Sequence, residues 1–197
     1  MVRILYIDDE PSLLTLTQIY LKEEADFDVD TAESAEDGLL MLQSETYDAV
    51  ISDYDMPDMN GIELLKCVRD ENPLIPFIIF TGKGREEVVI EALNNGADFY
   101  LQKGGDPKPL FTELANAIRH LVRRSRAEDS ALQSKKDWQE IRLSVNLNLD
   151  DIEEALKHLL FLTRNSPEAT HNADRIHRAM DHIRSGIPSD NEAEKGA

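Results

Sequence analysis

Short apolar runs alternate with longer amphipathic segments from the start of the chain to about residue 124. In each longer segment, apolar residues recur every three or four positions, which is the period of one helix face. Five runs are predicted to be strands, at residues 3–7, 27–31, 47–52, 75–80 and 99–102. Five strand-then-helix units predict an α/β domain, in which a doubly wound, five-stranded parallel sheet has helices on both faces.

Local signals place the helices between these strands. Pro11 suits the first turn of a helix, Ser34 is a preferred N-cap, and Asn95-Gly96 is a typical helix end. The helix after the fifth strand is expected to begin at Asp106-Pro107. The residues expected to face inward are Leu13, Leu14, Leu16, Ile19, Tyr20 and Leu21 in the first helix, Leu39, Leu40 and Leu42 in the second, Ile62, Leu64, Leu65 and Val68 in the third, and Val88, Val89, Ile90, Ala92 and Leu93 in the fourth.

No strand-like run follows residue 124, and the pattern there is helical throughout. Residues 125–147 are expected to form a helical linker that continues the preceding helix. Residues 148–186 are expected to form a helical hairpin, its two helices starting at Asn148 and Ser166-Pro167. Each helix has one apolar stripe, and two such helices bury little apolar surface by themselves. The hairpin should therefore pack on the first domain or on a second copy. Residues 187–197 are expected to be a disordered tail.

The charge is strongly negative and unevenly spread. The chain has 39 acidic and 21 basic side chains, a net charge of −18, and residues 1–63 hold 17 acids against only Arg3 and Lys22. This balance argues against nucleic acid as a direct ligand and suggests a cation site. No apolar run is long enough to span a bilayer, and Cys67 is the single cysteine. We therefore expect a soluble, cytoplasmic protein that does not bind membranes.

Polar side chains follow four of the predicted strands directly: Asp8 and Asp9, Asp53, Thr81, and Lys103. The carboxyl ends of parallel strands meet at one edge of a sheet, where binding sites form. Converging carboxylates repel one another unless a cation neutralises them, and oxygen-only ligands favour magnesium. Lys103 and Thr81 would suit phosphoryl oxygens, and an aspartate can be the nucleophile that forms an acyl phosphate. The pattern therefore indicates a magnesium-dependent phosphoryl site.

Four segments together resemble the receiver domain of two-component response regulators. They are Ile7-Asp8-Asp9-Glu10-Pro11, residues 52–61 (SDYDMPDMNG), Phe80-Thr81-Gly82 and Tyr100-Leu101-Gln102-Lys103. The resemblance covers residues 1–124 and implies the flavodoxin-like receiver fold. It also implies that Asp53 accepts a phosphoryl group from a phosphohistidine on a sensor histidine kinase.

The resemblance further implies the role of each site residue. Asp9 would bind Mg²⁺ directly and Asp8 mostly through water, while Asp53 and the backbone carbonyl of Asp55 complete the metal site. Thr81 and Lys103 would hold the phosphoryl group.

Tyr100 matches the aromatic switch residue that turns inward when Thr81 moves toward the phosphate. The family usually has a cis proline after the lysine, whereas Lys103 is followed by Gly104-Gly105. A trans bond and a looser loop are expected there, because a cis bond before glycine costs about 2.5–4 kcal/mol.

Two other resemblances are weaker. Asp53-Tyr54-Asp55 has the spacing of the catalytic pair of haloacid-dehalogenase-like phosphatases, although that family places its pair after the first strand. The hairpin resembles the paired dimerisation helices of histidine kinases, with Asp150-Asp151 where those kinases have His-Asp. Kinase activity is therefore not expected, and a chance likeness between amphipathic helices is the alternative.

No helix-turn-helix with a basic recognition face is visible in the sequence. We therefore expect a response regulator that signals through phosphorylation-dependent contact with an unidentified protein target, without binding DNA. The alternative is a dimerisation switch in which the hairpin forms a homodimer. No enzymatic activity is expected beyond self-phosphorylation and slow autodephosphorylation at Asp53.

Overall fold

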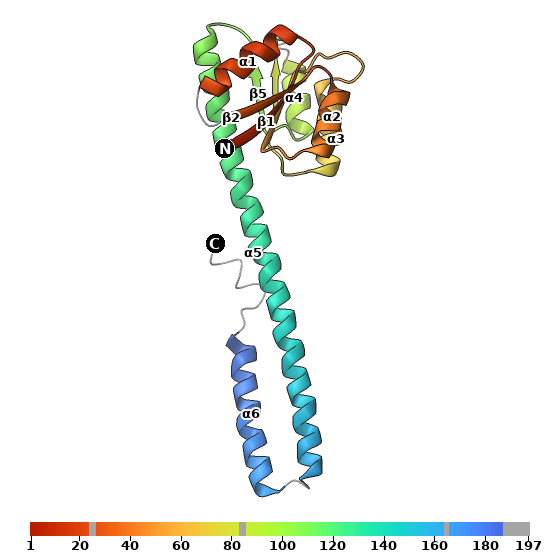
Figure 1. Cartoon of the computed structure of the whole chain (residues 1–197), viewed down its shortest axis with the longest axis vertical. Helices are drawn as coiled ribbons and strands as arrows, with labels where there is room; N and C mark the ends of the chain where they lie inside the picture. Colours follow the sequence, from red (N-terminus) through yellow and green to blue (C-terminus); the bar gives the residue numbers. More distant parts are fainter. Residues whose placement is uncertain (24–26, 83–85, 164–165, 187–197) are drawn as a thin grey trace. The chain divides into compact units, whose positions relative to one another are not determined.

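The computed structural model describes residues 1–23, 27–82, 86–163 and 166–186, so the predicted tail at 187–197 lies outside the described residues. The chain divides into two compact units, Met1–Glu128 and the residues from Asp129 onward. Figure 1 shows the elements in chain order: β1 (Val2–Ile7), α1 (Pro11–Glu23), β2 (Phe27–Ala32), α2 (Ala35–Ser44), β3 (Ala49–Ser52), α3 (Gly61–Glu71), β4 (Phe77–Thr81), α4 (Glu86–Asn94), β5 (Phe99–Gln102), α5 (Pro107–Leu162) and α6 (Pro167–Gly186).

The first unit contains one sheet of five parallel strands in the order β2-β1-β3-β4-β5. This topology confirms the predicted doubly wound α/β fold. The strand predicted at 75–80 begins two residues later, at Phe77. Pro76 has no N–H to donate to the ladder, although its carbonyl accepts a bond from Val50 N, at 2.8 Å.

Alternate residues of each strand point to opposite faces of the sheet, and each face has its own core. Ile4 and Tyr6 of β1 belong to the core that α1 and α5 cover. Leu5 and Ile7 belong to the core on the other face, which α2, α3 and α4 cover (Figure 1). The central strands are buried on both faces, which explains why they appear in the sequence as nearly continuous apolar runs.

The prediction of inward-facing residues was right for α3, where Ile62, Leu64, Leu65 and Val68 are buried. It was too broad for α1, which buries only Leu14, Thr17 and Leu21. A helix that lies on a sheet buries a narrow stripe, so Leu16 and Ile19 project into solvent, 39% and 50% exposed. The same correction applies to Leu40, Ile90 and Leu93.

The predicted helix start at Asn148 is wrong. A single helix, α5, runs from Pro107 to Leu162, and Asn148 lies in its interior. Between Pro109 and Pro167 the sequence has no glycine or proline to end a helix. Without such a residue, the capping preference of Asn148 does not interrupt the helix.

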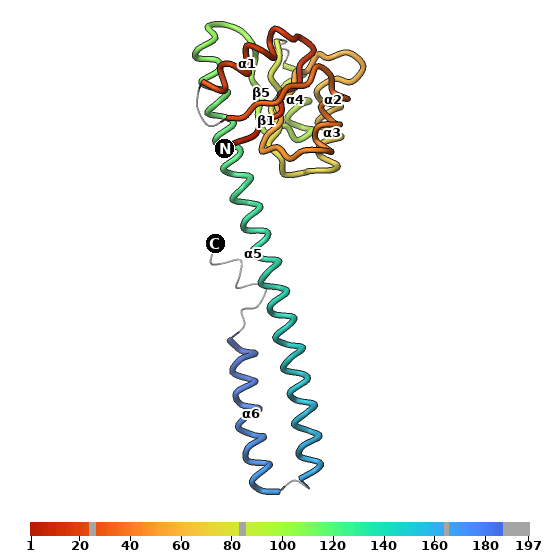
Figure 2. The backbone as a smooth tube through the Cα atoms, viewed as in Figure 1, coloured from red at the N-terminus to blue at the C-terminus, as the bar shows by residue number. Residues whose placement is uncertain are grey.

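The second unit contains the predicted helical hairpin. Figure 2 shows α6 running back beside the end of α5. Four buried residues form its core: Leu149, Leu156, Ala173 and Met180. Ser166 caps α6 by accepting a hydrogen bond from the Ala169 amide, at 3.2 Å, which fits the predicted start at Ser166-Pro167.

Three polar contacts hold α5 where it leaves the first unit's core. Arg124 and Arg126 bond Asp98 and Asp48, at 3.0 and 2.8 Å, and the Ser125 hydroxyl donates to the Leu74 carbonyl, at 2.9 Å. These three partners precede β5, β3 and β4. They therefore lie at the amino ends of the strands, opposite the edge where the polar residues gather.

Asp98 is the most connected of these partners. Besides Arg124, it accepts bonds from the Arg69 guanidinium, at 2.7 Å, and from the Phe77 amide, at 3.0 Å. Burial lowers the pKa of Arg69, and the carboxylate of Asp98 opposes that shift. Asp98 is thus the counter-charge that allows a partly buried guanidinium to sit between α3 and β5.

Asp98→Ala should destabilise the first unit by about 2–3 kcal/mol, because it removes the negative charge that balances the Arg69 guanidinium and the acceptor of the Phe77 amide. Urea unfolding followed by circular dichroism measures this loss. Asp70→Ala, on the exposed side of α3, is the matched control and should change stability by less than about 0.5 kcal/mol. Equal effects of the two substitutions would contradict this account of Asp98.

Candidate functional site

The four polar positions predicted from the strand ends meet at one edge of the sheet. Asp8 follows β1, Asp53 follows β3, Thr81 is the last residue of β4, and Lys103 follows β5. Strand β1 pairs with β2 at one edge and with β3 at the other, so the chain turns to opposite directions along the sheet after β1 and after β2. The site therefore occupies the point where strand order reverses, which is where open α/β sheets bind their ligands.

The Lys103 ammonium joins the two central carboxylates. Its Nζ lies 2.6 Å from Oδ2 of Asp8 and 2.7 Å from Oδ1 of Asp53. Asp8 is fully buried and Asp53 is 6% exposed, so both charges are largely removed from water. Such burial is tolerated only when the charges are paired and hydrogen-bonded, and Lys103 supplies that pairing.

Backbone and side-chain donors hold the other carboxylate contacts. Oδ2 of Asp53 accepts a bond from the Asp55 amide, at 2.5 Å, and Oδ1 of Asp8 accepts one from the Glu10 amide, at 3.1 Å. The Tyr6 hydroxyl donates to Oδ2 of Asp8. Burial raises the pKa of Tyr6, and the negative charge of Asp8 raises it further, so the phenol stays protonated and remains a donor.

The loop after Asp53 packs closely against the start of α3. The Ser52 hydroxyl donates to the Asp53 carbonyl, at 2.7 Å, and the Gly61 amide donates to the Tyr54 carbonyl, at 3.0 Å. A Cβ atom added at Gly61 would lie 2.2 Å from the Asp53 carbonyl oxygen. Only glycine permits this approach, which fixes the backbone that carries Asp53.

Thr81 and Tyr100 lie on the neighbouring strands. Thr81 is buried, and its carbonyl accepts a bond from the Lys103 amide, at 2.8 Å. Tyr100 is half-buried and packs on the core beneath α3 and α4. Burial raises the pKa of Tyr100, and the negative charge of Asp53 adds to the shift, so the ring lies within the electrostatic reach of the site.

The expected cluster of three carboxylates is not assembled. Asp9 and Asp55 are exposed, and within the described ranges no group of three His, Cys, Asp or Glu side chains is placed to hold a metal ion. In this arrangement the Lys103 ammonium lies between Asp8 and Asp53 and balances their charge. The donors nevertheless fit Mg²⁺, which in proteins is commonly bound through one or two carboxylates and several waters.

The loop after Lys103 follows the expectation for its two glycines. No cis peptide bond occurs among the described residues, so the predicted trans bond before Gly104 is confirmed. Gly104 and Gly105 have φ angles of 153° and 81°. Glycine adopts such angles without the steric cost that a side chain would bring.

Three further residues shape the site, and no role was predicted for them from the sequence: Tyr6, Ser52 and Gly61. Tyr6 could have been found, because it precedes Asp8 by two residues in a strand and therefore shares its side of the sheet. The roles of Ser52 and Gly61 depend on how closely the loop approaches α3, and no spacing in the sequence shows that distance.

Residues 4–115 match the family model of the response regulator receiver domain. This match covers more than half of the chain, which therefore belongs to the family of response regulator receiver domains. The geometry agrees with the match, since the five-stranded parallel sheet and the positions of Asp8, Asp53, Thr81 and Lys103 at the strand ends are those that the sequence predicted.

Similar curated proteins are response regulators. The transcriptional regulatory protein PhoP for alkaline phosphatase synthesis, from Bacillus subtilis, is 32% identical over 138 residues, which are 70% of this chain and 55% of PhoP. Response regulator Rre1 of Synechocystis is 31% identical over 142 residues, which are 71% of this chain and 60% of Rre1. The chain thus spans little more than half the length of these two relatives.

Solved structures show the same fold. A receiver domain protein of Clostridium thermocellum has a TM-score of 0.59 and 30% identity, over 64% of this chain and 98% of that one. TrrA of Thermotoga maritima, solved in complex with Mg²⁺ and BeF, has a TM-score of 0.55 and 32% identity, over 61% and 99% of the two chains. In the part of our chain that the structure describes, no helix combines the length and apolarity needed to cross a membrane.

Gly61→Ala should displace the Asp53 backbone, because the new methyl group would overlap the Asp53 carbonyl oxygen. We expect a loss of about 2–4 kcal/mol in the free energy of unfolding, typical of a forced backbone shift. Thermal or urea denaturation measures it. Gly186→Ala, where an added Cβ has no atom within 4 Å, is the control, and an equally stable Gly61→Ala would refute the close approach.

Proposed function

We propose that Asp53 accepts a phosphoryl group from a phosphohistidine on a sensor histidine kinase, and that the chain then signals through contact with a target protein. The observation that carries this proposal is the paired geometry of Asp53 and Lys103: a nearly buried carboxylate lies 2.7 Å from an ammonium at the ligand-binding edge of the sheet. Membership of the receiver family supports the same role.

In the proposed transfer, a carboxylate oxygen of Asp53 attacks the phosphorus atom while the bond from phosphorus to the histidine nitrogen breaks. The products are an acyl phosphate on Asp53 and an unmodified histidine on the kinase. The Lys103 ammonium and the Thr81 hydroxyl would donate hydrogen bonds to the phosphoryl oxygens, where negative charge gathers during transfer. Apart from slow hydrolysis of this acyl phosphate, we propose no enzymatic turnover.

Magnesium is the proposed cofactor. Asp8, Asp9, Asp53 and the Asp55 carbonyl would hold it, and when bound it would neutralise charge on the transferring phosphoryl group. The all-oxygen character of this donor set supports the assignment. The TrrA structure is a complex with Mg²⁺ and BeF, and that relative is 32% identical to this chain.

Thr81 and Tyr100 are the proposed switch. Tyr100 is half-buried, and the negative charge of Asp53 contributes to its raised pKa. A phosphoryl group added to Asp53 would therefore change the electrostatic surroundings of the Tyr100 ring. Movement of the Thr81 hydroxyl toward the phosphate would open space for the ring. The consequence would be a changed surface over α4, β5 and α5, to which a target protein binds.

We propose that the output of this chain is protein contact and that it does not bind nucleic acid. Residues 127–197 hold 14 acidic and 9 basic side chains, a balance that disfavours contact with phosphate backbones. PhoP is named a transcriptional regulator, but the matched part of PhoP is about half of that protein. The alternative output is a dimerisation switch, which requires a change in mass on phosphorylation.

A phosphatase function is less well supported. The Asp53-Tyr54-Asp55 pair follows β3, and the Asp55 side chain is exposed. Sustained release of phosphate from a generic phosphomonoester would favour a phosphatase, whereas a single Mg²⁺-dependent labelling favours the receiver.

Asp53→Asn should abolish labelling by acetyl phosphate or by a kinase, because the amide cannot form an acyl phosphate. Phosphate-affinity electrophoresis and intact-mass measurement detect the added group. Asp58→Asn, which changes an exposed carboxyl in the same loop, should leave labelling unchanged. Labelling that persists in Asp53→Asn with an intact fold would show that another residue is the acceptor.

Asp9→Ala should weaken Mg²⁺ binding by about tenfold or more, since it removes a proposed ligand from the site. Isothermal titration calorimetry measures the affinity, and Glu10→Ala provides an exposed, neighbouring control. An affinity that is the same in wild type and Asp9→Ala would remove Asp9 from the metal site while leaving the assignment of Asp53 intact.

A further inference from the structure

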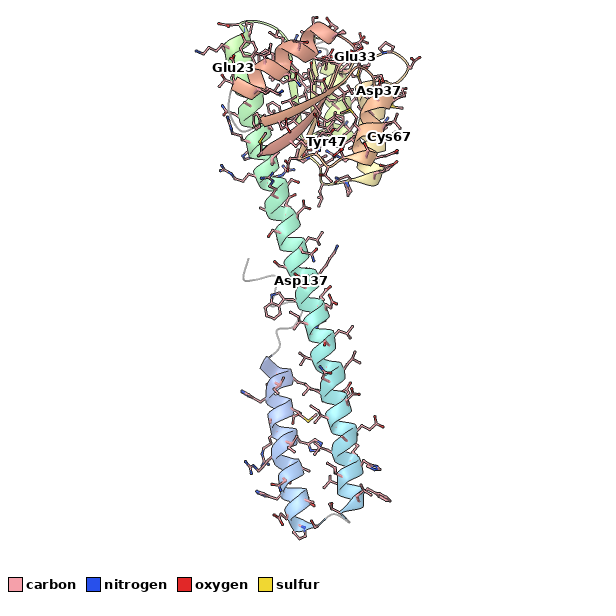
Figure 3. The ribbon with its side chains drawn as sticks, viewed as in Figure 1. Glu23, Glu33, Asp37, Tyr47, Cys67 and Asp137 are labelled. Atoms are coloured by element: carbon pink, nitrogen blue, oxygen red, sulfur yellow. The ribbon has the colours of Figure 1, made fainter. Side chains whose placement is uncertain are left out.

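A long stretch of α5 is exposed to solvent. Residues 126–141 are all exposed, and the hairpin core with α6 begins only at Val145 and Leu149. In Figure 3 the label Asp137 marks this stretch, which lies beyond the end of α6. Trp138 and Ile141 lie in it, 59% and 52% exposed. Large apolar side chains are thus displayed on a helix that nothing described in the chain covers.

These side chains start a regular stripe that continues to the end of α5. The stripe consists of Trp138, Ile141, Val145, Asn148, Ile152, Ala155, Leu159 and Leu162. The spacings alternate between three and four residues, which is a heptad seam, and seven of the eight positions are apolar. The stripe lies beside the face that packs on α6. Leu149 and Leu156 do not belong to the stripe, whereas Val145 belongs to it and also packs against the hairpin core.

The exposed side of α6 repeats this arrangement. Ile176 and Ile183 are seven residues apart and are 40% and 48% exposed. Together with Ile152 they line an open groove of about 490 Å³ between the two helices. Both helices of the hairpin therefore present apolar side chains to the same groove.

A second copy of this chain is the occupant that the apolar stripe and the groove favour. A two-helix hairpin with a four-residue core buries little surface, and two such hairpins make a four-helix bundle. A two-fold axis brings each seam against an identical seam, and this is the commonest symmetry of soluble oligomers. A parallel arrangement also places the uncovered stretches of both α5 helices together, so that each covers the other.

The charges beside the groove are complementary between the two helices. On α5, Asp151 precedes the seam residue Ile152, and Glu154 precedes Ala155. On α6, Arg175 lines the groove beside Ile176, and Arg178 lies one turn further along. A bundle in which α5 of one copy neighbours α6 of the other pairs acids with arginines at the rim.

We propose that the second unit is a homodimerisation module. The α5 helices of two copies form a parallel coiled coil from about Trp138, and this widens into a four-helix bundle where α6 joins. Asn148, the polar residue of the seam, meets its own copy at the centre and fixes the register. The seam contains no residue of the phosphoryl site, so the dimer forms in the unphosphorylated chain.

Sedimentation equilibrium of the full chain tests this proposal. The wild-type protein should have the mass of a dimer. The double variant Ile152→Glu/Leu159→Glu should be monomeric or dissociate at least about 100-fold more readily, because it buries charge in the seam. The matched control is Leu143→Glu/Leu147→Glu, which changes equally apolar residues, 63% and 58% exposed, that lie off the seam.

A monomeric wild-type chain, or equal dissociation of the control variant, would overturn the proposal. A monomer that instead retains an unrelated protein on the seam would assign the groove to a different partner. Unchanged helical circular dichroism in the seam variant would show that dissociation is not unfolding.

Disulfide cross-linking tests the parallel register independently. In a Cys67→Ser background, Ser134→Cys extends the seam by one position and should cross-link with its own copy on mild oxidation. Gln139→Cys, on the outer side of the helix, should not. Failure of Ser134→Cys to cross-link in a chain with dimer mass would overturn the parallel arrangement. Labelling of Asp53, measured in the same variants, tests the phosphoryl site separately.

Discussion

The first unit depends on one buried interaction, the ammonium of Lys103 held between the carboxylates of Asp8 and Asp53. Two carboxylates taken out of water this close together repel each other, and each also pays a desolvation cost of several kcal/mol. The ammonium offsets both costs only if the ends of β1, β3 and β5 are brought to the same point. The order β2-β1-β3-β4-β5 achieves this, and the two apolar cores that fix the strands are therefore what hold the chemistry in place.

The same pairing limits the freedom of the neighbouring backbone. Asp53 Oδ2 accepts a bond from the Asp55 amide, and the Asp53 carbonyl accepts one from the Ser52 hydroxyl. Gly61 then closes the loop at a distance that excludes a Cβ atom. The Asp53 carboxylate, bonded by the Asp55 amide and Lys103 on a fixed backbone, is therefore oriented before any ligand arrives. Such preorganisation is what a nucleophile needs.

The sequence predicted the sheet and the strand-end residues well, because buried parallel strands have an unmistakable apolar pattern and their carboxyl ends must meet at one edge. The sequence did not predict features that depend on how one element lies against another. Leu16 and Ile19 are as apolar as Leu14, yet only the geometry of α1 on the sheet decides which of them is buried. Asn148 has a capping preference that a helix without glycine or proline overrides. Asp9 is exposed, and the buried pair Asp8 and Asp53 is neutralised by Lys103, which lies fifty residues beyond Asp53 and on another strand end.

The long helix α5 contributes residues to both units. Its first turns bury Phe111, Leu114 and Ile118 against the sheet, so their spacing is explained by the core of the first unit. From Trp138 onward an equally regular spacing continues, and its side chains are exposed apart from the half-buried Val145. In a protein with a net charge of −18, two copies repel each other in most encounters. To overcome this repulsion, a partner must cover the exposed apolar seam along its whole length. The identical seam of a second copy can do so in a single register.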